Sequence, residues 1–170
     1  RGEHKRNSIE SEMIRLLESN CVPLLSYAIT SSPLITKKYQ SLFPKTTFET
    51  ILNVFSKEYL SKNQSMSDIL PIKLFWFSQY VGKKRGLETI IVAMSLLPKK
   101  SVSLTLLGVA SNEMKKYFLE LMFDLNLSED QLTFLDPVRE VDIVSIASNH
   151  HVGMASEPGR DLNNELALSN

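Results

Sequence analysis

The stretch that decides the fold is residues 72–109, which read IKLFWFSQYVGKKRGLETIIVAMSLLPKKSVSLTLLGV. Apolar runs at residues 72–78 and 102–109 have the length of buried strands. Residues 88–97 between them have the length of a helix, and Pro98 ends that helix. A strand, a helix and a strand at this spacing predict two parallel strands joined by a crossover helix. This segment therefore predicts an α/β fold.

The same alternation continues toward the carboxyl end of the chain. Residues 112–126 predict an amphipathic helix, and residues 131–135 and 151–155 predict two more strands. The helix has an apolar stripe, expected to face the core, of Met114, Phe118, Leu121 and Met122. Residues 138–148 are ambiguous because their β-branched content favours a strand, whereas their place between two strands favours a helix. We predict a helix there, and a Rossmann-like parallel sheet with crossover helices.

The amino-terminal part has a looser pattern. We predict a helix, a buried strand, a helix and a strand at residues 9–17, 24–30, 33–42 and 48–55. The chain then turns polar at residues 56–66, a change in composition that is typical of a domain boundary and also of a surface loop. We predict one domain portion over residues 1–60 and a second over residues 61–170.

Composition narrows the classes of partner. Lys plus Arg equals Asp plus Glu, at 19 each in 170 residues, so no global field attracts nucleic acid. The single cysteine, Cys21, favours a reducing compartment and leaves no internal disulfide. No apolar run is as long as a membrane span and no signal peptide is visible, so we expect a cytoplasmic protein. Because the chain begins with Arg1 and stops at Asn170 inside a predicted helix, we also expect a piece of a longer protein.

A basic loop, Gly-Lys-Lys-Arg-Gly at residues 82–86, directly follows the predicted strand at residues 72–78. Two glycines that flank three cations allow the backbone to approach a diphosphate and neutralise it. The loop matches neither the G-x-G-x-x-G fingerprint nor the P-loop, which counts against a dinucleotide oxidoreductase and an NTPase. A solvated charged turn is the other interpretation of this loop.

A second candidate segment, EPGRDLNNE at residues 157–165, follows the last predicted strand. Glu157 lies at the carboxyl end of that strand, and Asn163 or Asn164 suits a helix N-cap, which places Glu165 in the first helical turn. Ligands of open α/β sheets bind at this edge, where helix N-termini attract anions. The pattern therefore suits a nucleotide diphosphate, although both glutamates would also be ordinary as solvated surface residues.

These two segments carry a resemblance to a known family. The E-x7-E spacing of residues 157–165 resembles that of the retaining glycosyltransferases of group 1, or family 4, which have the GT-B fold. The segment SQYVGKKRGLETIIVAMSLL resembles the family's donor-domain opening, in which a strand, a short loop and a cation precede a glycine. The chain departs from the family at Ser78-Gln79, where Gly-Arg is usual and the loop is shorter by about one residue, and at residues 158–160, where Gly-Phe-Gly is usual.

The resemblance implies a fragment of an enzyme that transfers a sugar from a nucleotide-diphosphate donor with retention. Residues 1–60 would be the end of the acceptor domain and residues 61–170 part of the donor-binding domain. The implied donor contacts are Glu157 as the catalytic residue at the sugar, Arg85, Lys84 and Gly82 at the diphosphate, Glu165 at the ribose, and the amides of Leu162, Asn163 and Asn164 at the phosphates. No metal or cofactor is implied, because the nucleotide sugar is a substrate.

Partners follow from the same resemblance. We expect a nucleotide-diphosphate sugar, an unidentified saccharide or lipid-linked acceptor, no nucleic acid, and peripheral association of the full-length protein with a membrane surface. The fragment alone is expected to be inactive. The competing hypothesis is a non-catalytic α/β nucleotide-binding or regulatory domain. A response regulator would be expected to have acidic residues where this chain has Ser78 and Gln79.

Overall fold

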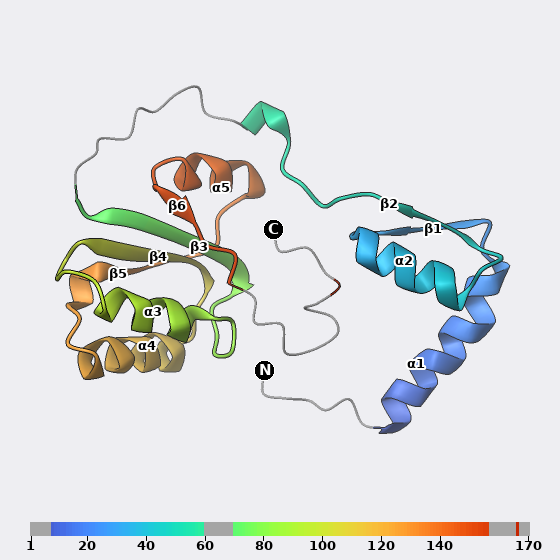
Figure 1. Ribbon diagram of the computed structural model, residues 1–170, viewed down its shortest axis with the longest axis horizontal. Coiled ribbons are helices and arrows are strands. Elements are labelled where there is room, and N and C mark those ends of the chain that lie inside the picture. The colour runs from blue at the N-terminus through green and yellow to red at the C-terminus, as the bar shows by residue number, and fades with distance from the viewer. Residues whose placement is uncertain (1–7, 60–69, 157–165, 167–170) are drawn as a thin grey trace. The chain divides into compact units, whose positions relative to one another are not determined.

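The computed structural model describes residues 8–59, 70–156 and Leu166. The chain divides into two compact units, one of residues 1–54 with 159–170 and one of residues 55–158, and each is described by itself (Figure 1). The division falls just ahead of the polar stretch at residues 56–66. Phe55 belongs to the second unit because its ring packs 5.7 Å from that of Phe77, measured between centroids. The assignment of the units to acceptor and donor sides stays a prediction.

The first unit is built around a β-α-β arrangement. Its elements are α1 (Ser8–Cys21), η1 (Val22–Leu24), β1 (Tyr27–Thr30), α2 (Pro33–Leu42) and β2 (Thr47–Thr50). Strands β1 and β2 pair in parallel. Helix α2 has the predicted bounds because its start is fixed locally: the Ser32 hydroxyl accepts a hydrogen bond from the Leu34 N–H at 3.2 Å, and Pro33 holds the first helical position.

Two strand predictions in this unit are partly wrong. The strand expected at residues 24–30 begins only at Tyr27, and Tyr27 and Ile29 are 63% and 54% exposed rather than buried. The strand expected at residues 48–55 ends at Thr50, opposite Thr30, where its partner strand also ends. Both errors have one cause, because an apolar run becomes strand only as far as a neighbouring strand supplies hydrogen-bond partners.

The second unit has the predicted Rossmann-like alternation. Its elements are η2 (Lys57–Tyr59), β3 (Ile72–Tyr80), α3 (Leu87–Ser95), β4 (Val102–Val109), α4 (Asn112–Asp124), η3 (Glu129–Gln131), β5 (Leu132–Leu135), α5 (Glu140–Ala147) and β6 (Val152–Gly153). The strands are all parallel in the order β5-β4-β3-β6. The ambiguous segment at residues 138–148 is helical, as predicted. None of the helices in the described ranges is long and apolar enough to cross a membrane.

Helices cover both faces of this sheet (Figure 1). Helices α3 and α4 lie on one face and α5 lies on the other. This placement follows from the strand order, because the chain steps from β3 to β4 to β5 in one direction and then returns to the far side of β3 for β6. The core forms between β3, β4, α3 and α4, and its fully buried members include Leu87, Ile91, Leu104, Leu106, Phe118 and Met122.

Two phenylalanines on α4 provide a test of this core. Phe118 is fully buried and Phe123 is 77% exposed. We expect Phe118→Ala to lower the free energy of unfolding of the second unit by about 3 to 5 kcal/mol, because it removes buried apolar surface and leaves a cavity. Phe123→Ala should change it by less than about 0.5 kcal/mol. Urea unfolding followed by fluorescence of Trp76, the single and buried tryptophan, measures both, and equal effects would contradict the described packing.

Candidate functional site

The strand order places a switch point beside β3. This strand pairs with β4 on one edge and with β6 on the other, where Leu74 lies opposite Val152 and Phe75 opposite Gly153. The connections after β3 and after β6 therefore run in opposite directions along the sheet. In open α/β sheets such a point leaves a crevice at the carboxyl ends of the two strands, and ligands bind there.

The two segments that leave these strands are in direct contact. The Ser156 hydroxyl donates a hydrogen bond to the Arg85 carbonyl oxygen at 3.0 Å. Gly86 has a φ of 77°, and a Cβ at this position would lie 2.0 Å from the Ser156 carbonyl oxygen. Only glycine fits a left-handed backbone so close to another chain segment. The loop after β3 is thus pinned against the segment that follows β6.

Arg85 is folded back over the end of β3. One of its guanidinium nitrogens, Nη1, donates a hydrogen bond to the Ser78 hydroxyl at 2.5 Å. Its Cζ atom lies 5.9 Å from the centroid of the buried Trp76 ring, within the range of a cation–π attraction. Arg85 itself is half-buried. The structure therefore holds this guanidinium at the carboxyl edge of the sheet.

A bulge in β3 accompanies this arrangement. Phe77 lies opposite Leu107 and Tyr80 opposite Val109, so β3 carries one residue more than β4 over the same step. Gly108 of β4 makes room, since a Cβ there would lie 2.2 Å from the Ser78 carbonyl oxygen. Bulges re-aim side chains near strand ends. The one-residue excess of this chain over the family pattern thus coincides with a bulge in the strand next to Ser78.

The two lysines of the loop have different partners. The Lys83 ammonium lies 3.9 Å from the centroid of the Tyr117 ring on α4. Lys84 has a φ of 62°, and its backbone N–H donates a hydrogen bond to the Glu88 carboxylate in the first turn of α3 at 3.2 Å. Both lysine residues are exposed. The sequence left open which lysine accompanies Arg85, and the structure directs Lys83 toward α4.

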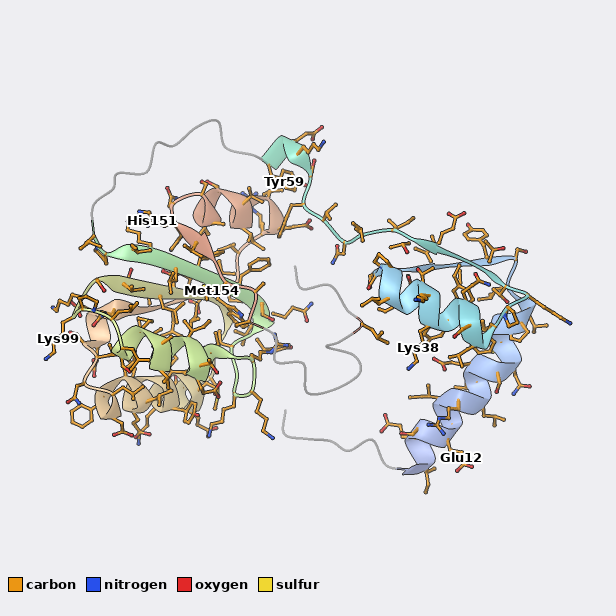
Figure 2. The ribbon with its side chains drawn as sticks, viewed as in Figure 1. Glu12, Lys38, Tyr59, Lys99, His151 and Met154 are labelled. Carbon is orange, nitrogen blue, oxygen red and sulfur yellow. The ribbon has the colours of Figure 1, made fainter. Side chains whose placement is uncertain are left out.

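The histidine pair before β6 connects strands. His151 donates its backbone N–H to the Lys73 carbonyl at 2.8 Å and accepts the Lys73 N–H at Nδ1 at 2.9 Å. His150 places Nε2 at 3.0 Å from the Thr105 hydroxyl and packs its ring against Phe75. Figure 2 shows His151 and Met154 on either side of β6. These contacts agree with our interpretation of the pair as a helix-to-strand turn.

An apolar groove of about 650 Å³ runs along α3. It passes between the helix and the strands, and its lining residues are Ile72, Leu74, Gly86, Thr89, Ile90, Ala93, Met94, Leu97, Val102, Met154 and Ser156. Ionised groups are strongly disfavoured in such surroundings unless they are paired. A diphosphate would therefore bind at the loop above the groove, where cations and N–H groups are present, and not inside it.

Part of the predicted site lies outside the described residues. This holds for Glu157, Leu162, Asn163, Asn164 and Glu165, whereas Gly82, Lys84 and Arg85 are described. The described chain before that gap ends at Ser156, the residue that contacts Arg85 and Gly86. Among the described residues, no group of three or more His, Cys, Asp or Glu side chains is arranged to hold a metal ion.

Sequence reasoning missed Ser78, Glu88, Tyr117 and Ser156 as parts of this site. Glu88 had a usable signal, because an acidic residue in the first turn of a helix can accept a backbone N–H that precedes the helix. Tyr117 had none, because only the packing of α4 beside α3 brings it to the loop. Ser78 was noted only as the residue that stands where glycine is usual.

Comparisons with known proteins add the following findings. No family model and no curated protein matches the chain. Among solved structures, Anabaena HepE in complex with UDP matches with a TM-score of 0.65 at 18% identity, over 85% of this chain and 42% of HepE. HepE with UDP and glucose gives 0.59 at 18% identity, over 89% and 44%. TarM of S. aureus, in complex with Fondaparinux, alpha-GlcNAc-glycerol and UDP, gives 0.53 at 15% identity, over 87% and 29%.

These matches concern the fold. The described chain has the parallel α/β fold of a GT-B Rossmann-like half domain, so the predicted fold class is confirmed. The neighbours are GT-B glycosyltransferases, and this chain spans less than half the length of each.

Two glycines of the basic loop test the contact between the loop and the segment after β6. A Cβ at Gly86 meets the Ser156 carbonyl, whereas a Cβ at Gly82 meets nothing within 4 Å. We expect Gly86→Ala to destabilise the second unit by at least about 1 to 2 kcal/mol, from the left-handed φ alone. Gly82→Ala should leave its stability within about 0.5 kcal/mol of the original. Trp76 fluorescence during urea unfolding separates the two, and a well-tolerated Gly86→Ala would refute the contact.

Proposed function

We propose that this chain is part of a glycosyltransferase that takes its sugar from a nucleotide-diphosphate donor, and that the second unit binds the donor diphosphate. The observation that carries the proposal is the 3.0 Å hydrogen bond from Ser156 to the Arg85 carbonyl, which joins the basic loop to the segment after β6 at the switch point. The fold shared with HepE and TarM, both in complex with UDP, supports the same function.

In this proposal Arg85, Lys84 and Gly82 hold the diphosphate. Negative charge accumulates on the diphosphate as the bond to the anomeric carbon breaks, and fixed positive groups there stabilise the transition state. The Arg85 guanidinium is already hydrogen-bonded to Ser78, so little conformational freedom is lost when it meets a phosphate. Backbone N–H groups at the start of α3 add to the attraction.

The remaining donor contacts are proposals carried by the family resemblance. Glu157 would hold the sugar near the anomeric carbon and Glu165 the ribose hydroxyls, while the amides of Leu162, Asn163 and Asn164 would bind the phosphates. Transfer with retention, as in group 1 enzymes, belongs to the same proposal. No metal or cofactor is needed, because cations and N–H groups would neutralise the phosphates.

The proposed acceptor is a saccharide or a lipid-linked saccharide. We place the full-length protein in the cytoplasm, with peripheral association at a membrane surface. The fragment alone is expected to bind the donor without transferring the sugar, since acceptor binding and donor binding involve different domains in this family.

The first test of the proposal is the dependence of UDP binding on Arg85. Calorimetric titration of the chain with UDP should give measurable binding, and Arg85→Ala should weaken it by roughly 10- to 150-fold, the equivalent of losing a charged hydrogen bond. Lys99→Ala is the matched control, because Lys99 is an exposed cation at the opposite end of the sheet (Figure 2). Equal losses in both variants would reveal a general charge effect and would count against the site.

A second test separates the ribose contact from the diphosphate contact. We expect Glu165→Ala to weaken UDP by roughly 10-fold or more and to leave inorganic pyrophosphate binding unchanged, since pyrophosphate has no ribose. Arg85→Ala should weaken both ligands. Parallel titrations with GDP and ADP identify the preferred base. Nucleotide binding that neither substitution affects would favour the competing non-catalytic α/β domain.

A further inference from the structure

The basic loop is anchored on both sides of β3. Toward β6, Gly86 and Arg85 contact Ser156. Toward β4, Lys83 reaches the Tyr117 ring on α4, the helix that follows β4. Because β3 lies between β4 and β6, these two anchors draw opposite ends of the loop apart. Lys83 is therefore directed away from the switch point between β3 and β6.

The Lys83 ammonium already has an electron-rich partner. At 3.9 Å from the ring centroid it lies well within the distance over which an aromatic quadrupole attracts a cation. An ammonium that neutralised a phosphate at the switch point would have to give up this contact. The position of Lys83 thus favours a role in holding the loop, while Arg85 is held at the sheet edge by Ser78.

The middle of the loop has a separate support. Lys84 has a left-handed backbone, which is uncommon for residues other than glycine and requires compensating contacts. The Glu88 carboxylate supplies one by accepting the Lys84 N–H. The same carboxylate lies near Tyr117, where burial first and the Glu88 charge second raise the pKa of the phenol. Tyr117 therefore stays neutral at physiological pH and retains the electron-rich ring that Lys83 contacts.

We propose that Tyr117 and Glu88 are positioning residues that pre-form the phosphate-binding loop, and that Lys83 anchors this loop to α4 and does not bind the diphosphate. The inference rests on the proposed function and deepens it, because it divides the three cations between two tasks. A loop that is ordered before its ligand arrives loses less conformational entropy on binding. Lys84 and Arg85 are then the side chains left for the phosphates.

A double-mutant cycle tests this division. UDP is titrated into the chain carrying Lys83→Met, Tyr117→Leu or both. Each single substitution should weaken UDP about two- to five-fold, the range expected for an exposed cation–π contact, and the double should be no weaker than either single, because all three variants lack the same contact. Tyr117→Phe keeps the ring and should stay within about twofold of the original. Phe123→Leu, an exposed aromatic on the same helix, is the matched control.

Two results would overturn the inference. One is a loss for Lys83→Met as large as that for Arg85→Ala, which would make Lys83 a direct diphosphate ligand. The other is full additivity of Lys83→Met and Tyr117→Leu, which would show that the two side chains act independently.

A measurement without UDP keeps this inference separate from the proposed function. Hydrogen exchange of the Lys84 amide, followed by NMR, should become several-fold faster in Lys83→Met and in Tyr117→Leu than in Phe123→Leu. Unchanged exchange overturns the anchoring role whether or not UDP binds. Faster exchange in a chain that binds no UDP supports the anchoring role and refutes the proposed function for this chain.

Discussion

Strand β3 is hydrogen-bonded to parallel strands on both of its edges, and the rest of the second unit depends on this double pairing. Parallel neighbours cannot be joined by tight turns, so each connection must cross a face of the sheet with a helix. Leaving β3 on one side and returning on the other forces α3 and α5 onto opposite faces. The carboxyl end of β3 is then the one place where segments leaving toward both faces meet, and the basic loop lies there.

Close backbone approaches turn this meeting point into a defined shape. Gly86 lets the loop touch the Ser156 carbonyl, and Gly108 lets the bulge of β3 touch β4. Neither approach leaves room for a side chain. The bulge precedes the loop, and the Ser78 hydroxyl within it accepts the hydrogen bond that orders Arg85. A chain of local constraints therefore connects the register of the central sheet to the position of one guanidinium group.

The parts of the fold that were predicted well are those with local causes. The bounds of α2 follow from Ser32 and Pro33, and β4 is a continuous apolar run that is buried on both faces. Helix α5 was chosen over a strand by its place in the alternation, which is a topological argument. The strands β1 and β2 were predicted too long, because their ends depend on a partner strand. The stripe on α4 was predicted as core, and Phe118 and Met122 are indeed buried.

The candidate site divides along the same line. Arg85 and the loop were found because glycines and cations adjacent in sequence stay adjacent in space. Ser78 and Tyr117 were not, because the first depends on a glycine in the neighbouring strand and the second on helix packing.

Three adjacent cations repel one another, and the structure reduces this repulsion without a bound anion. Lys83 turns to an aromatic ring and Arg85 to a hydroxyl and an indole, in opposite directions along the loop. The Glu88 carboxylate lies between them in sequence and space, holding the loop backbone and lowering the local charge from three to two. In water two unit charges at contact interact by only about 1 kcal/mol, so one carboxylate and a few degrees of separation are enough to keep the loop ordered. The charge of two that remains matches the charge on a diphosphate, which is why an anion of that size suits this edge of the sheet better than the apolar groove beside it.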